Sequence, residues 1–247
     1  MFDYNAPSQL LKDKVILVTG AGDGIGKVAA LTYAEHGATV ILLGRTLKKL
    51  EAVYDAIETL GHPQAAIVPL NLDGAAEHDY LELANTIESE FGHLDGLLHN
   101  ASVLGDRTAI STYNPATFEH VMRVNVTSQF LLNQALLPLL EKSDMASVIF
   151  TSSSVGRKAQ ANWGAYAVSK FATEAMMQLL SSELAIKTPN IRVNCINPGA
   201  TKTKMRASAY PNEDPTALPN AVDIMPLYLY LMGEDSLAVN GQSIDAQ

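Results

Sequence analysis

The chain has 247 residues, of which 47% are hydrophobic, and its formal net charge is −9 at pH 7. This length favours one domain with a large core, and the negative charge argues against a nucleic-acid partner. Its single cysteine, Cys195, excludes an internal disulfide and fits a cytoplasmic location. No apolar run approaches the roughly 18 residues of a membrane span, and the N-terminal MFDYNAPSQLLKDK does not read as a signal peptide.

Short apolar runs alternate with segments of helical spacing along the whole chain. The predicted strands are 14–20, 38–44, 65–72, 94–101, 146–153, 191–199 and 241–247, and the predicted helices are 25–36, 47–60, 80–91, 115–141 and 165–186. Strands without alternating polarity, each followed by a helix, predict a parallel sheet that is covered on both faces. We therefore expect an α/β fold in one domain over 1–247: a Rossmann-type, doubly wound sheet of about seven strands in a three-layer sandwich.

The segment TGAGDGIG, residues 19–26, closes the first predicted strand and opens the first helix. Its glycines Gly20, Gly24 and Gly26 allow a tight turn and the close approach of a ligand. The helix N-terminus that follows offers free N–H groups and a partial positive charge to a pyrophosphate. A tight turn without a ligand is the alternative, but the strand–turn–helix context favours a dinucleotide.

Further motifs follow in chain order: HNAS at 99–102, Asn125 within VNV, SSVG before YAVSK at 166–170, and NPG at 197–199. With the glycine turn, they make the chain similar to the short-chain dehydrogenase/reductase family, in its single-domain subtype, over about 11–245. Within that family it resembles bacterial oxidoreductases related to 3-oxoacyl-(acyl-carrier-protein) reductases. The resemblance implies a nicotinamide cofactor and a carbonyl/alcohol substrate pair.

Tyr166 and Lys170 lie four residues apart, so they share one face of a helix. Hydride transfer to a carbonyl creates a developing alkoxide that needs a proton, and a tyrosine can donate it. A free phenol has a pKa of about 10, and we expect the Lys170 ammonium to lower that pKa toward neutrality. Such pairs are common on helix surfaces, so the functional interpretation depends on the other motifs.

The family resemblance adds two more catalytic residues. The family's serine lies 13 residues before its tyrosine, which selects Ser153 among three consecutive serines to bind the substrate oxygen. Asn125 interrupts an apolar helix; by resemblance it holds a water that connects Lys170 to solvent, and otherwise it is a plain polar surface position. The expected catalytic set is therefore Asn125, Ser153, Tyr166 and Lys170.

The second predicted strand ends in LLGRT, with Gly44 where an acidic residue would bind the ribose of NAD. Arg45 follows and suits a 2′-phosphate, which predicts NADP(H); a solvated position at the helix start is the alternative. Against NADP(H), Asp23 lies in the glycine turn, where NADP-binding relatives often carry Arg or Lys. The expected cofactor-binding residues are Gly20, Gly22, Asp23, Gly24, Ile25, Gly26, Arg45, Asn71, Leu72, Asn100, Ala101, Tyr166, Lys170, Pro198, Gly199, Thr201 and Thr203.

Other candidate features are less informative. The six histidines form no metal-ligand motif, so no metal is expected, and Cys195 reads as a core residue. Trp163 either lines the substrate pocket or packs its loop, and the irregular stretch 201–220 is either a substrate lid or an ordinary connection.

The sequence therefore predicts an NADP(H)-dependent oxidoreductase that interconverts a carbonyl and a secondary alcohol. A 3-oxoacyl thioester-like compound is one substrate that the resemblance implies. A cofactor-binding sensor on the same scaffold is the main alternative; an epimerase or dehydratase would need more substrate-binding chain. The resemblance also implies a homodimer or homotetramer.

Overall fold

The computed structural model describes residues 1–247 and contains one sheet of seven parallel strands. The strands are β1 (Val15–Thr19), β2 (Thr39–Gly44), β3 (Ala66–Pro69), β4 (Gly96–His99), β5 (Ala146–Thr151), β6 (Ile191–Asn197) and β7 (Ser243–Asp245). Their order across the sheet is β3-β2-β1-β4-β5-β6-β7, so the chain winds outward from β1 first on one side and then on the other. The predicted doubly wound parallel sheet is confirmed.

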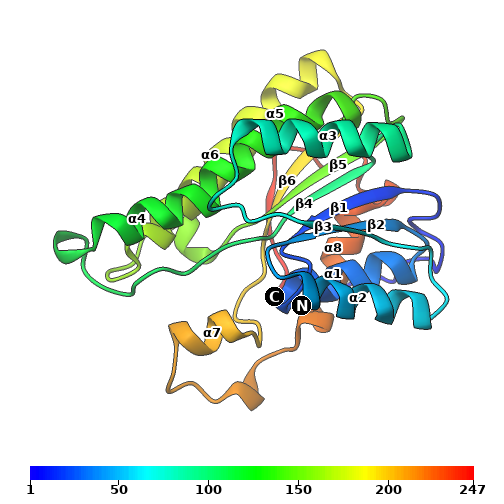
Figure 1. Ribbon diagram of the computed structural model, residues 1–247. Helices are drawn as coiled ribbons and strands as arrows, with labels where there is room; N and C mark the ends of the chain where they lie inside the picture. Colours follow the sequence, from blue (N-terminus) through cyan, green and yellow to red (C-terminus); the bar gives the residue numbers. More distant parts are fainter.

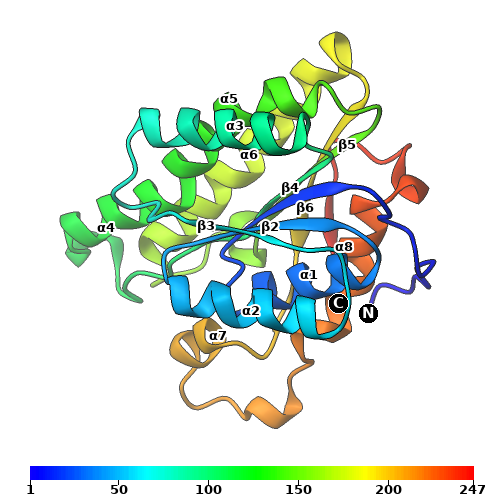
Figure 2. The ribbon, with the colours of Figure 1, turned by 45° about the vertical axis from the view of Figure 1, so that its right-hand side comes forward.

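Helices cover both faces of this sheet (Figures 1 and 2). They are α1 (Gly24–Glu35), α2 (Leu47–Thr59), α3 (Glu77–Phe91), α4 (Pro115–Met122), α5 (Ser128–Leu140), α6 (Gly164–Lys187), α7 (Lys204–Ala209) and α8 (Met225–Met232). In Figure 1 α1, α2 and α8 lie on one side, and α3, α5 and α6 lie on the other. None of these helices is both long enough and apolar enough to cross a membrane.

Each face of the sheet has its own hydrophobic core. Successive side chains of β1 point to opposite faces, so Ile16 and Val18 pack into the core under α1, α2 and α8. Val15 and Leu17 pack into the other core, with residues of α3, α5 and α6. Strands that are buried on both faces must be apolar at every position, which is why they read as continuous hydrophobic runs.

The helix α8 was not among the predicted elements. Its sequence MPLYLYLM is apolar on every side, so it has no 3.6-residue pattern, and six of its residues are buried. The side chain of Arg192, on β6, binds the carboxyl end of α8 by donating hydrogen bonds to the carbonyls of Leu231 and Gly233. A cation at that end also complements the helix dipole.

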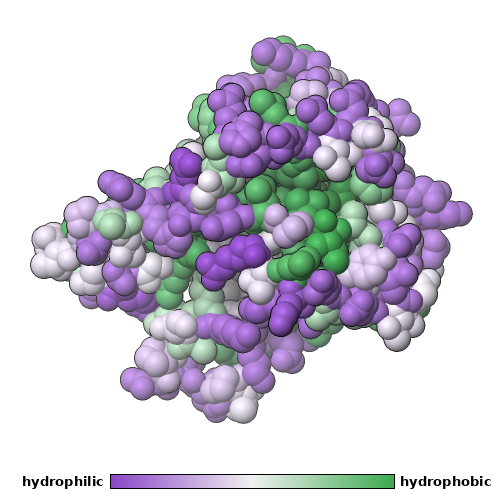
Figure 3. Space-filling model, viewed as in Figure 1, coloured by the Kyte–Doolittle hydropathy of each residue, from purple (hydrophilic) through white to green (hydrophobic).

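The long helix predicted over 115–141 is divided by a π-helical turn at Arg123–Thr127, which contains Asn125. Pro69 ends β3, as its position suggested. Because β3 is an edge strand, its residues 66–68 are only half-buried, and Figure 3 shows apolar surface there between α2 and α3.

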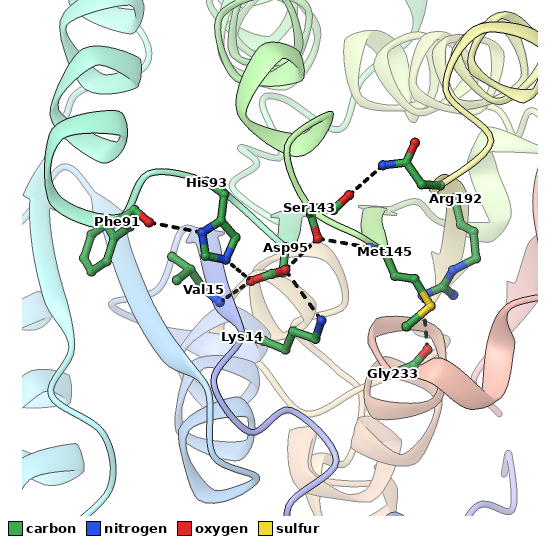
Figure 4. A network of polar contacts seen from close by, with 10 residues as sticks. Lys14, Val15, Phe91, His93, Asp95, Ser143, Met145, Arg192 and Gly233 are labelled. Atoms are coloured by element: carbon green, nitrogen blue, oxygen red, sulfur yellow. Dashed lines mark hydrogen bonds and ion pairs between the residues drawn. The ribbon is translucent and has the colours of Figure 1, made fainter.

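A polar network ties the amino ends of β1 and β4 together (Figure 4). The buried carboxylate of Asp95 accepts hydrogen bonds from the Val15 N–H (2.8 Å) and the Ser143 hydroxyl (2.6 Å), and it lies 3.0 Å from the His93 ring. Lys14 adds an ion pair at 3.6 Å. With all its oxygens satisfied, this carboxylate is a structural group.

Candidate active site

At the carboxyl ends of the strands lies a cavity of about 500 Å³. Parallel α/β sheets bind ligands at this edge, where the strand order reverses. The predicted site residues that line the cavity are Gly20, Gly22, Asp23, Gly24, Ile25, Arg45, Asn71, Leu72, Asn100, Ala101, Ser153, Tyr166, Lys170, Pro198, Gly199, Thr201 and Thr203. Gly26 and Asn125 are absent from that lining. Residues separated by more than 180 positions therefore share one site.

The glycine turn closes one end of the cavity. Gly20 and Gly24 have φ values of +70° and +53°, in the left-handed region that favours glycine. Gly26 has a different role from the expected one, because it faces the backbone rather than the cavity. A Cβ at Gly26 would lie 2.4 Å from the Gly20 oxygen and 2.5 Å from Nδ2 of Asn100, so this glycine permits close packing of the turn against β1 and β4.

Asp23 stabilises the turn through three contacts. Its carboxylate caps α1 by accepting a hydrogen bond from the Gly24 N–H at 2.9 Å. It also pairs with the ammonium groups of Lys49 at 2.6 Å and Lys204 at 3.1 Å. These hydrogen bonds, that from Lys49 above all, lower the pKa of Asp23 to about 2. The ammonium groups of Lys49 and Lys204 thus offset the negative charge of Asp23, which was the argument against NADP(H).

Thr19, at the end of β1, orders the neighbouring strand end. Its hydroxyl accepts hydrogen bonds from the N–H groups of Asn100 (2.9 Å) and Ala101 (3.0 Å) and donates one to the Leu98 carbonyl (3.2 Å). Sequence reasoning did not assign this role to Thr19, and no local pattern reveals it. Ser102, next in the chain, stands where the family pattern Asn-Asn-Ala-Gly, which HNAS at 99–102 resembles, has glycine. Its φ is not positive, so the serine causes no backbone strain.

The opposite end of the cavity contains Tyr166 and Lys170, one turn apart on α6. Burial raises the pKa of Tyr166 to about 12, although a hydrogen bond with Ser153 acts to lower it. Burial also lowers the pKa of Lys170 to about 8. The Lys170 ammonium donates to the Thr151 carbonyl at 2.7 Å and lies 5.5 Å from the centroid of the phenol ring.

This arrangement corrects one expectation. We expected Lys170 to lower the pKa of Tyr166, but in the protein alone desolvation dominates and raises it. The lysine's short hydrogen bond is to Thr151 instead. Tyr166 is therefore protonated at neutral pH, in the form that donates a proton.

The three serines of 152–154 have different environments. Ser153 lines the cavity and bonds Tyr166. Ser152 borders the cavity too, but its hydroxyl is buried with no hydrogen-bond partner. Ser154 begins a short 3-10 helix and is exposed. Of the three, only Ser153 both faces the cavity and contacts the tyrosine.

Asn125 is fully buried in the π-helical turn. Its side-chain oxygen accepts from the Val103 N–H at 2.8 Å, and its nitrogen donates to the Val103 carbonyl at 2.9 Å and to Ser169 at 3.0 Å. These contacts fasten the chain after β4 to α6. The plain-surface alternative is thus wrong, whereas the relay role stays a prediction.

The end of β2 has the geometry that the sequence suggested. Arg45 is exposed, lines the cavity, and makes no hydrogen bond or ion pair with the rest of the chain. At Gly44 a Cβ would lie 3.2 Å from a methyl carbon of Leu50, which leaves little room for an acidic side chain. Asn71 and Leu72 border the cavity beyond the end of β3.

Two threonines in the segment after β6 stabilise its local structure. Thr201 donates to the Pro198 carbonyl at 3.0 Å, and Thr203 caps α7 by accepting from the Arg206 N–H at 3.1 Å. The cavity is also lined by Lys204, Met205, Arg206, Ala209 and Tyr210. The helix α7 projects away from the sheet (Figure 1). Figure 3 shows the surface hollowed between this projecting part and the body of the molecule.

An apolar wall lies beside Tyr166. Trp163 both lines the cavity and packs its surroundings, with its ring 5.7 Å from that of Tyr166 and 5.9 Å from that of Tyr210. Trp163 therefore packs its surroundings, as one alternative proposed, and whether the cavity that it lines binds substrate stays a prediction. Sequence reasoning missed the rest of this wall, because its members have no motif. They are Leu104, Met205, Ala209 and Tyr210.

No cluster of three or more His, Cys, Asp or Glu side chains could hold a metal ion. His99, which replaces an asparagine of the family pattern, is buried against Phe150 and bonds Asn133 at 2.9 Å. Burial lowers its pKa to about 4, so its ring is neutral. Cys195 is buried in the core, as expected.

The chain is similar to known proteins over its whole length. Residues 14–214 match the family described as short chain dehydrogenase. The Escherichia coli (strain K12) protein named uncharacterized oxidoreductase YciK is 55% identical over 99% of this chain and 96% of its own. A structure from Pseudomonas syringae, described as a short chain dehydrogenase, is 58% identical with a TM-score of 0.98 over 100% of both chains.

A further structure, from Shigella flexneri 2a, was determined as a complex with NADP. It is 54% identical and covers 98% of this chain and 100% of its own, with a TM-score of 0.95. The family match alone spans well over half of the chain, and the fold, the glycine turn and the Tyr166–Lys170 pair agree with it. The protein is an oxidoreductase that belongs to the short chain dehydrogenase family.

Proposed function

We propose that the protein is an NADP(H)-dependent oxidoreductase that interconverts a carbonyl compound and a secondary alcohol. The observation that carries this proposal is the convergence of Ser153, Tyr166 and Lys170 at one end of a cavity whose other end is the glycine turn. A relative 54% identical forms a complex with NADP, which supports the same cofactor here.

The residues present fit a nicotinamide dinucleotide. The glycine turn offers the N-terminus of α1 to a pyrophosphate, and Gly24 leaves its Cβ position open, with only a Thr203 methyl carbon at 3.8 Å. Arg45, without a partner in the protein, would bind a 2′-phosphate, and Asn71 with Leu72 would border the adenine. Asn100 and Ala101 would border the adenosine side, and the nicotinamide and its phosphates would lie beside Pro198, Gly199, Thr201 and Thr203.

In the chemical step, the bound cofactor supplies or accepts the hydride. Tyr166, protonated at neutral pH, donates its proton to the carbonyl oxygen during reduction and takes it back during oxidation. Ser153 donates a hydrogen bond to the same oxygen and stabilises the developing negative charge. Lys170, already aimed at the end of β5, provides a cation beside the phenolate that forms. By the family resemblance, Asn125 would complete the relay by holding a water that connects Lys170 to solvent.

For the substrate, a 3-oxoacyl thioester-like compound remains the proposal that the family resemblance supports. The wall beside Tyr166 is apolar, and Arg206, the cation within it, is held by Glu213 through two hydrogen bonds of 2.6 and 2.5 Å. Such a wall suits an uncharged acyl or cyclic group next to the carbonyl.

The test is NADPH oxidation with acyl thioesters, quinones, aldehydes and cyclic ketones. Tyr166→Phe removes the proton donor and is expected to lower turnover about a thousandfold, while NADPH binding by fluorescence changes less than about twofold. Full turnover by Tyr166→Phe would refute the mechanism. Tight NADPH binding without turnover of any carbonyl would instead favour the cofactor-binding sensor.

We propose a homodimer or homotetramer as the working form. Phe130 on α5 and Phe171 and Leu179 on α6 are exposed large apolar side chains on one helical layer, and such patches commonly mark an interface. Light scattering on the purified chain tests this, and a monomer at micromolar concentration would contradict it.

A further inference from the structure

The segment 202–219, which contains α7, has few attachments to the rest of the protein. Its backbone hydrogen bonds all stay within the segment. Two polar side-chain contacts reach outside it: Lys204 pairs with Asp23 beside the glycine turn, and the Ala209 carbonyl accepts from Arg107 at 2.6 Å. The first contact lies beside the glycine turn and the second near Trp163 and Tyr166, so the segment is attached at both ends of the cavity.

Arg107 makes more than this hydrogen bond. Its guanidinium lies 4.2 Å from the centroid of the Trp163 ring and 5.0 Å from that of Tyr210. It therefore joins an aromatic residue of the fixed body to one of the segment 202–219. No carboxylate pairs with Arg107, so the aromatic faces and the carbonyl are its partners.

The loop that carries Arg107 is itself firmly anchored. The buried Tyr113 packs closely against two glycines, one of which, Gly105, belongs to this loop. A Cβ at Gly105 would lie 2.5 Å from the Tyr113 hydroxyl, and a Cβ at Gly164 would lie 2.1 Å from the Tyr113 ring. The Tyr113 hydroxyl also accepts from the Asp106 N–H at 3.0 Å. Arg107 thus extends from a fixed point, directly after this anchor, toward the weakly attached segment.

We propose that Arg107 is a positioning residue for the reaction: it fastens the segment 202–219 to Trp163 and so closes the substrate end of the cavity beside Tyr166. It acts through Trp163, Ala209 and Tyr210, which line the cavity, whereas Arg107 itself lies outside the lining. The effect on substrate use rests on the proposed function, but the fastening itself does not.

Two measurements on the full chain without substrate test the fastening. Trp163 is the chain's single tryptophan, so its emission and acrylamide quenching report on the guanidinium stacked against it. Arg107→Met is expected to raise both the quenching constant and the rate of tryptic cleavage after Lys202, Lys204 and Arg206, the latter about tenfold, since a hydrogen bond from a charged group and a cation–π contact are lost.

The matched control is Lys158→Met, which removes an exposed cation from the loop before Trp163 that makes no side-chain polar contact. It is expected to leave quenching and cleavage unchanged. Arg107→Lys keeps a cation that can stack on Trp163. Its quenching constant and cleavage rate should therefore rise by no more than half as much as those of Arg107→Met. The melting temperature of Lys158→Met should match the wild type, and that of Arg107→Met should fall by no more than about 5 °C, which separates this role from a general loss of stability.

With a carbonyl substrate in hand, Arg107→Met is expected to raise KM about tenfold with less than about a twofold change in the Kd of NADPH. Unchanged quenching and cleavage in Arg107→Met would overturn the fastening. Unchanged KM with altered quenching would overturn the positioning role. If no carbonyl is reduced by the wild type, the proposed function fails, while the quenching and cleavage results still decide the fastening.

Discussion

The two ends of the cavity are built in different ways. At the glycine turn, the site is made of backbone held by strand ends: Gly26 packs against Gly20, and Thr19 orders the N–H groups after β4. Beside Tyr166, the outer wall is made of side chains from the loop after β4, the start of α6 and the segment around α7, and Arg107 contacts the last two. The difference implies that changes at the first end disrupt the fold and the cofactor site together, whereas changes at the second alter substrate use with little effect on stability.

The largest effect is expected at the glycine turn. Gly26→Ala places a methyl group 2.4 Å from the Gly20 oxygen, where backbone cannot give way, and should cost about 3 kcal/mol of unfolding free energy and most of the NADPH affinity. Urea denaturation and NADPH fluorescence measure the two losses. Gly74→Ala is the control, because its Cβ would meet only an amide nitrogen at 3.8 Å. If Gly26→Ala and Gly74→Ala were equally stable, the glycine turn would not be the end of the cavity at which changes disrupt the fold.

The next effect concerns Lys170, in the middle of the cavity. Its folded pKa of about 8 lies below the ordinary 10.5, so between these values the unfolded chain binds more protons and this lysine's contribution to stability rises with pH. Below pH 8 its buried charge opposes folding. Lys170→Met should therefore be more stable than the wild type by about 2 kcal/mol at pH 7, with the difference shrinking toward pH 10.

Urea denaturation at intervals between pH 7 and about pH 10 measures this dependence. The control is Lys187→Met, at the exposed end of the same helix, which should shift stability little at any pH. A difference for Lys170→Met that is constant over the range would show that the ammonium is not destabilised by burial.

A smaller effect tests the choice of cofactor. Arg45→Asp should weaken NADPH binding about 10- to 100-fold and leave NADH binding nearly unchanged, since one charge-assisted contact to the 2′-phosphate is lost. Fluorescence titration with both cofactors gives the ratio. Lys48→Asp makes the same charge change on an exposed neighbour outside the cavity lining. A preference for NADH that Arg45→Asp does not move would refute the NADP(H) assignment.

The smallest effect is expected at the outer wall. Glu213→Gln weakens the pair with Arg206, in which the side chains are 24% (Arg206) and 28% (Glu213) exposed, but keeps a hydrogen-bond acceptor. It should change the melting temperature by less than about 2 °C. The freed Arg206 cation still stacks on Tyr210 at 3.8 Å. Differential scanning fluorimetry makes the measurement, with Glu88→Gln, which breaks another exposed pair, as the control. A shift as large as that of Gly26→Ala would show that the wall contributes to stability like the glycine turn.

Much of the fold was predictable because its signals are local. A strand buried on both faces must be apolar along its length, as β1 and β5 are, and a turn that approaches a helix start needs glycine. Tyr166 and Lys170 share a face because the spacing of four residues is a property of every helix. All of the predicted site residues except Gly26 and Asn125 line one cavity, because the carboxyl ends of parallel strands lie at one edge of the sheet.

The sequence by itself determined the sheet, the glycine turn and the position of the catalytic helix. Only the tertiary structure decided the pKa of Tyr166, because desolvation depends on everything packed around the phenol and outweighs the hydrogen bond with Ser153. It likewise decided that Asp23 faces Lys49 and Lys204, and that Arg107 stacks on Trp163. These contacts join residues 26 to 181 positions apart, and no spacing along the chain encodes them.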